Sequence, residues 1–144
     1  MHTEHDEAVE LGEAIGQRLE LLPTLVAMVQ AEPASGRLLT LLNAVEHAVG
    51  CDDRTDAELV GLAYAAAQLS LMLGNEPDAA RWAHRGLRLD PHHAGLAIIV
   101  GWLPDDINLG DPAVTILRRV AQRHPGYRDV RSALERRAHQ LACH

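Results

Sequence analysis

The chain has 144 residues, a formal net charge of −7 and 47% hydrophobic side chains. This length supports one domain with its own core, and the composition excludes a largely disordered chain. No apolar stretch reaches the ~18–20 residues of a membrane span, and the acidic start MHTEHDE lacks the apolar run of a secretory leader, so we expect neither. The acidic total argues against a general nucleic-acid binder, because such affinity comes largely from neutralising phosphates.

Alanine and leucine dominate the composition with 22 residues each, whereas phenylalanine is absent. β-Branched and aromatic residues, which strands favour, are scarce, so an all-α fold is expected. All 13 basic residues are arginine, which suggests a GC-rich bacterial genome. Cys51 and Cys143 lie far apart and form no CxxC pair, which favours two free thiols in a reducing compartment, the cytoplasm.

The spacing of apolar residues predicts a series of short helices. In chain order they run over 4–31, from a Ser35 cap to about Val49, from Thr55 to Gly74, over about 76–89, from Asp90-Pro91 to before Pro104, from Asp111-Pro112 to about His124, and over 127–142. Pro23 interrupts the first of them, because proline lacks the N–H that the helix ladder requires. Thr55 and Glu58 have the spacing of a capping box, which fixes the start of the third helix.

A 34-residue period runs through the second half of the chain. Pro91 and Pro125 end the similar segments GLRLDP and VAQRHP, and Ala79 and Ala113 are separated by the same interval. Small residues let two paired helices approach closely, and each proline separates one unit from the next. This pattern resembles the tetratricopeptide repeat, a helix–turn–helix unit of 34 residues.

The resemblance implies an α-solenoid of about seven or eight helices, stacked as antiparallel hairpins in a single domain. Its parts are the N-terminal helices (1–59), two repeats (60–93 and 94–127) and a capping helix (127–142). In this register Ala67 and Gly101 take the small position of the first helix of each repeat. Gly74 takes the turn between the two helices of the first repeat, and Gly86 a small position in its second helix.

In this family the first helices of the hairpins line a concave groove that holds a peptide or a helix of a partner. The positions that match the groove are Gly61, Tyr64, Gln68, Leu71, Gly95, Ile98, Trp102 and Asp105. None of them is basic, so the lysine-based carboxylate clamp of some relatives is not expected. The lining suits an amphipathic helix or an extended apolar segment. For Tyr64 and Trp102, a place in the core is the alternative.

No set of catalytic or metal-binding residues is complete in the sequence. His139 and Cys143 share a helix face, but two ligands hold zinc only weakly. The loop over 105–111 is rich in acids and lacks the glutamate that ends a calcium loop. The chain has no GxGxxG, GxxxxGK[ST] or GxSxG motif. We therefore expect a protein that is no enzyme and holds no metal or cofactor, with a small metal-dependent enzyme as the weaker alternative.

Charge is divided unevenly along the chain. Residues 1–58 contain 12 acids and 3 arginines, which gives −9, whereas the last two helices carry seven arginines. A solvated capping face explains these arginines, and head-to-tail association of copies is the alternative. We predict a cytoplasmic adaptor, assembly factor or chaperone that binds another protein, with no nucleic-acid or membrane partner. The segment AARWAHRGLRLDP supports a second interpretation, the helical domain of a transcriptional or signalling regulator.

Overall fold

A computed structural model describes residues 10–15, 18–31, 36–50, 54–107 and 112–142, and this part of the chain contains no strand. Its helical elements are 10–15, η1 (Leu19–Leu21), α2 (Leu22–Ala31), α3 (Arg37–Val49), α4 (Asp56–Met72), α5 (Glu76–Leu89), α6 (Ala94–Trp102), η3 (Asp105–Ile107), α7 (Ala113–Arg123) and α8 (Arg128–Ala142). The all-α prediction is confirmed. None of these helices combines the length and the apolar character needed to cross a membrane.

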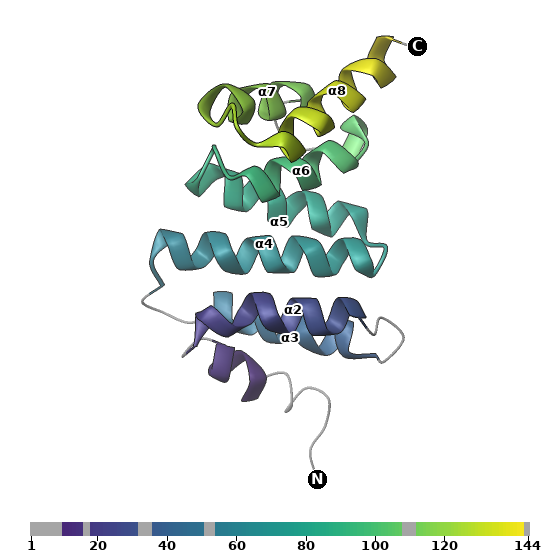
Figure 1. Cartoon of the computed structure of the whole chain (residues 1–144). Coiled ribbons are helices and arrows are strands. Elements are labelled where there is room, and N and C mark those ends of the chain that lie inside the picture. Colours follow the sequence, from purple (N-terminus) through teal and green to yellow (C-terminus); the bar gives the residue numbers. More distant parts are fainter. Residues whose placement is uncertain (1–9, 16–17, 32–35, 51–53, 108–111, 143–144) are drawn as a thin grey trace.

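The helices stack on one another from the N-terminal to the C-terminal end (Figure 1), and their contacts divide them into two rows. In the first row, α2, α4, α6 and α8 each pack against the next member of the row. In the second row, α3 packs on α4, α5 contacts both α4 and α6, and α7 contacts both α6 and α8. Contacts therefore join elements that are near each other in the sequence, which is the organisation of a helical repeat. The predicted stack of helix hairpins is confirmed.

The buried apolar residues form two clusters. The N-terminal cluster contains Ile15, Leu22, Val26, Val29, Leu38, Leu41, Leu42, Ala44, Val45, Ala48, Leu62, Ala65, Ala66 and Leu69. The C-terminal cluster contains Val60, Ala67, Ala79, Ala80, Ala83, Leu87, Leu96, Ala97, Ile99, Val100, Leu103, Ala113, Ile116, Leu117, Val120, Val130 and Ala133. Because α4 contributes to both clusters, it is buried on two sides. The helices before residue 59 thus belong to the same stack as the repeats.

The small residues of the 34-residue pattern lie where helices approach closely. A Cβ atom added to Gly86 would stand 2.5 Å from Cδ1 of Leu96, and one added to Gly101 would stand 3.0 Å from Cδ1 of Leu117. Gly74 has φ +77° in the turn between α4 and α5, a conformation that glycine adopts without steric cost. These positions agree with the places that the resemblance implies for the three glycines.

Local signals for helix ends act as the sequence predicts at some positions and not at others. Ser35, the predicted cap of α3, lies outside the described residues, and Gly36 takes the N-cap position. The start predicted at Asp90-Pro91 is wrong, because α6 begins at Ala94 with His93 as its N-cap.

Thr55 and Glu58 form a capping box, with the Glu58 N–H donating to Thr55 Oγ1 at 3.2 Å. Pro23 occupies the second position of α2, in the first turn, where a helix has no need of the missing N–H. The interruption therefore precedes Pro23, and α2 begins at Leu22 directly after η1.

Ser70 lies fully buried on α4, and its hydroxyl has no hydrogen-bond partner in the described part of the chain. An unsatisfied buried polar group costs about 1–3 kcal/mol. We expect Ser70→Ala to raise the free energy of unfolding by about 1 kcal/mol, because it removes this hydroxyl and keeps the packing. Urea denaturation measures the change, and an unchanged or lower midpoint would contradict the prediction.

Candidate functional site

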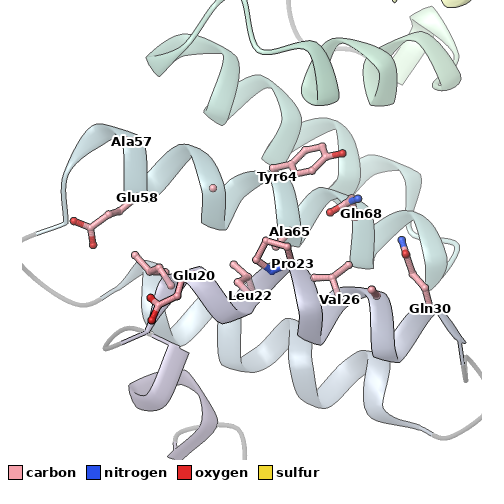
Figure 2. Close-up of a pocket in the computed structure, with 13 residues that line it drawn as sticks. Glu20, Leu22, Pro23, Val26, Gln30, Ala57, Glu58, Tyr64, Ala65 and Gln68 are labelled. Carbon is pink, nitrogen blue, oxygen red and sulfur yellow. The ribbon is translucent and has the colours of Figure 1, made fainter. Parts of the chain in front are cut away.

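A hollow of about 480 Å³ opens between α2 and α4 in the first row of helices (Figure 2). We call it the α2–α4 groove. It is lined by Leu19, Glu20, Leu22, Pro23, Val26, Ala27, Gln30, Ala57, Glu58, Gly61, Tyr64, Ala65 and Gln68. Its volume falls within the ~300–1,000 Å³ that is usual for ligand sites.

The floor of the α2–α4 groove is apolar. Leu22 and Val26 of α2 are buried there, as is Ala65 of α4. The α4 wall is low because Ala57 and Gly61 have little or no side chain, and a Cβ on Gly61 would meet no atom within 4 Å. The groove is therefore open space bounded by small and apolar groups, which can take apolar side chains from another molecule.

The two ends of the α2–α4 groove are polar and differ in charge. Glu20 and Glu58 lie at one end, and the amides of Gln30 and Gln68 lie at the other (Figure 2). Hydrogen bonds from Thr55 lower the pKa of Glu58, and a backbone hydrogen bond lowers the pKa of Glu20. Both carboxylates are therefore ionised at neutral pH and line this end of the groove, while each forms an ion pair with an arginine outside the lining.

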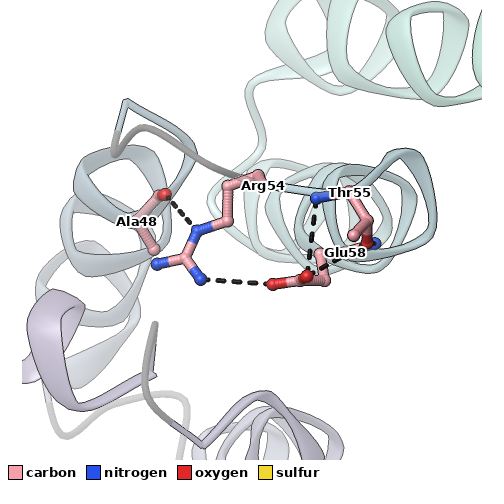
Figure 3. Close-up of polar contacts among 4 residues, drawn as sticks. All are labelled: Ala48, Arg54, Thr55 and Glu58. Carbon is pink, nitrogen blue, oxygen red and sulfur yellow. Dashed lines mark hydrogen bonds and ion pairs between the residues drawn. The ribbon is translucent and has the colours of Figure 1, made fainter.

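Arg54 holds Glu58 at the mouth of the groove (Figure 3). Its Nη1 lies 3.2 Å from Glu58 Oε2, and its Nε donates to the Ala48 carbonyl at 3.2 Å. Thr55 Oγ1 donates to the other carboxylate oxygen of Glu58 at 3.0 Å. Arg54 thus ties the end of α3 to the start of α4, and Glu58 has a fixed position on the groove wall.

The predicted groove residues of α4 lie partly in this hollow. Gly61, Tyr64 and Gln68 line the α2–α4 groove. Leu71 does not line it, because this side chain packs half-buried against the C-terminal cluster. The facing wall consists of α2, a helix to which the repeat pattern assigned no role.

The predicted groove residues of α6 lie elsewhere in the same row. Ile98 lines a second hollow of about 460 Å³, together with residues from the start of α8. Trp102 is 61% exposed, and the Arg136 guanidinium lies over its ring, 4.1 Å from the centroid. The alternative of a core position for Trp102 is therefore excluded. Asp105 begins η3, separated by two residues from the end of α6, and its side chain lies outside the described part of the structure.

Tyr64 explains why the predicted single groove is divided. A Cβ atom on Gly95 would collide with the Tyr64 ring, so this ring rests directly on the backbone of α6. The ring also lies against His93, with centroids 5.1 Å apart. Tyr64 therefore fills the space between α4 and α6, and burial there raises the pKa of its hydroxyl. The open space lies on the other side of α4, toward α2.

Sequence reasoning missed the α2 wall because residues 1–59 show no 34-residue period. One signal was available, since Leu19, Leu22 and Val26 follow each other at steps of three and four. Such spacing places residues on one helix face. It does not say which helix this face will meet.

His93 is a half-buried structural residue next to Tyr64. Its Nδ1 accepts a hydrogen bond from the Leu96 N–H at 3.1 Å and so caps the start of α6. Only a ring without a proton on Nδ1 can accept this bond. Burial lowers the pKa of His93 below its ordinary value of 6.5, although Asp90 acts in the opposite direction.

We expect acid to weaken the fold through His93. Because its pKa is lower in the folded state, the stability it contributes is present above about pH 6.5 and is lost as the pH falls through the folded value. Urea denaturation between about pH 7.5 and about pH 5 measures this loss. His93→Asn keeps a capping oxygen that does not titrate, and it should lose less stability over this range. An equal loss in both proteins would contradict the prediction.

Trp102 should contribute little to stability. Since the ring is mostly exposed, Trp102→Ala removes mainly its contact with Arg136, and we expect a loss of ~0.5–1 kcal/mol in the free energy of unfolding. Urea denaturation with circular dichroism measures it. A loss above about 2 kcal/mol would show that the ring supports the core after all.

In the described part of the chain, no three His, Cys, Asp or Glu side chains come together as a metal site. The Cys143 end of the His139–Cys143 pair and loop residues 108–111 lie outside the described residues. Comparison with known proteins gives no further guide, since no family model, curated protein or solved structure matches the chain.

Proposed function

We propose that the protein is a non-catalytic interaction module of tetratricopeptide-like architecture, which acts in the cytoplasm as an adaptor, assembly factor or chaperone. It binds an apolar segment of a partner protein in the α2–α4 groove. The observation that carries this proposal is the apolar hollow of about 480 Å³ along the first row of a helical stack. Stacked helices commonly offer such extended surfaces to partners.

Gly61 supports the proposal independently of the volume. Glycine inside a helix costs about 1 kcal/mol relative to alanine. At Gly61 no neighbouring atom demands this residue, because an added Cβ would meet nothing within 4 Å. Its contrast is Gly86, where close packing leaves no room for a side chain. Close approach of a partner to the α4 backbone accounts for a glycine at this position, which packing within the fold does not require.

Filling the groove tests the proposal. Gly61→Leu places a large side chain in the hollow, and Gly50→Leu is the matched control at the end of α3, outside the groove. Both variants should fold, as checked by circular dichroism and thermal melting. We expect Gly61→Leu to reduce recovery of bound proteins from native extract at least ~10-fold by quantitative mass spectrometry, a difference of about 1.4 kcal/mol, and Gly50→Leu to leave it unchanged. A folded Gly61→Leu variant that keeps all its partners would refute the proposal.

Trp102 and Ile98 extend the binding surface along the first row in this proposal. Trp102 is the large aromatic residue that the described chain exposes on α6, and binding energy concentrates at aromatic anchors. Once a partner is isolated, Trp102→Ala should weaken its binding while stability changes little.

A further inference from the structure

We infer that the partner segment is an amphipathic α-helix with a lysine or arginine at the end of its apolar stripe, next to Glu20 and Glu58. This inference rests on the proposed function of the α2–α4 groove and specifies the partner that the groove fits.

The hydrogen-bonding capacity of the groove favours a helix over an extended segment. Its floor consists of apolar side chains such as Leu22 and Val26, carried by helices whose interior backbone groups already bond within the helix. An extended segment would leave its own N–H and C=O groups unpaired over this floor, which is unfavourable. A helix satisfies these groups internally and presents only side chains.

The shape of the α4 wall also suits a helix. Ala57, Gly61 and Ala65 recur at every fourth position and lie on one face of α4. They leave a shallow channel along the helix axis, and the ridge of side chains on another helix packs into such a channel.

The charged groups that line the groove indicate that the bound helix carries a basic residue at its end. The described residues that line it include two carboxylates, Glu20 and Glu58, and no basic side chain. The arginines that pair with these carboxylates, Arg18 and Arg54, do not line the groove. A cation at the end of the bound helix therefore faces the charged groups of the described lining, which are both carboxylates, whereas an anion finds no partner in that lining. The net charge of −9 over residues 1–58 favours a basic partner at longer range as well.

A displayed library of 16-residue peptides tests the inference. The library varies the residues of the peptide's apolar stripe and the residues at both of its ends. Peptides that bind the full chain are selected. Peptides that also bind the Gly61→Leu variant are then removed. We expect the remaining peptides to be helical, to exclude proline from their middle, and to carry lysine or arginine at one end. If they carry acids as often as bases, or if proline is common in their middle, this inference is wrong and the proposed function stands. If no binder depends on Gly61, the proposed function itself fails.

A charge exchange then locates the basic end. Glu20 is the suitable position, because its side chain is 66% exposed and its ion pair is with Arg18 on the surface, whereas Glu58 also caps α4. Glu20→Lys should weaken binding of a selected lysine-ended peptide about fivefold, and the same peptide with glutamate in place of that lysine should bind the variant more tightly than the wild type. Fluorescence anisotropy measures both affinities. Equal affinity of each peptide for the two proteins would overturn the inference.

Discussion

Replacing Gly86 with valine is expected to lower the free energy of unfolding by about 3 kcal/mol, although glycine is usually the weaker residue inside a helix. The reason is the distance across the α5–α6 contact. A Cβ atom at this position would stand 2.5 Å from Cδ1 of Leu96 and 3.3 Å from Cβ of Ala63. Leu96 is fully buried, so its side chain has no free space into which it can turn. Urea denaturation measures the loss.

The same substitution at Gly61 is the matched control. Both glycines lie inside helices, but Gly61 has open space where its Cβ would be. Gly61→Val should therefore change the free energy of unfolding by less than about 0.5 kcal/mol. The double variant Gly86→Val/Leu96→Ala should be more stable than the sum of its single changes implies, because the shortened side chain makes room for the added one. Equal losses for the two valine variants would show that close packing is not what excludes a side chain at Gly86.

These glycines show which features of helix packing can be predicted from the sequence alone. The resemblance to the repeat implied small positions for Gly86 and Gly101 and a turn for Gly74, and the structure has close helix contacts at the first two and a turn at the third. Such expectations succeed because a repeat fixes the neighbours of each position in advance: the next unit always lies on the same side. Capping pairs such as Thr55 and Glu58 succeed for a similar reason, since the interaction is local in the chain.

The candidate site was harder to predict because its two walls come from unlike parts of the chain. The repeat pattern identified the exposed face of α4, with Gly61, Tyr64 and Gln68, but not the helix opposite. Tyr64 determines which helix faces α4 across the groove, because its ring rests on Gly95 and occupies the space toward α6. A helical period reports which residues share a face, and it does not report how far a large ring reaches across it.

The second large effect concerns cooperativity along the stack. Leu69 belongs to the N-terminal cluster and Leu117 to the C-terminal cluster, and both are fully buried. Replacing either with alanine should cost about 3 kcal/mol locally. The distribution of this loss along the chain should differ, because α4, which carries Leu69, packs against helices on both sides, whereas α7, which carries Leu117, packs against α6 and α8.

Native-state hydrogen exchange measures how far the loss of stability spreads along the stack in each of the two variants. Leu69→Ala should lower protection in α3 and in α5 alike, because both helices pack on α4. Leu117→Ala should lower protection in α7 and α8 about 100-fold, and leave α2 and α3 nearly unchanged, because an opening at one end of a linear stack need not spread past its neighbours. If Leu117→Ala lowers protection equally in α3 and α8, the two clusters unfold as one unit. The α2–α4 groove lies in the half of the stack distant from Leu117, so binding there should survive this substitution even while the far end opens.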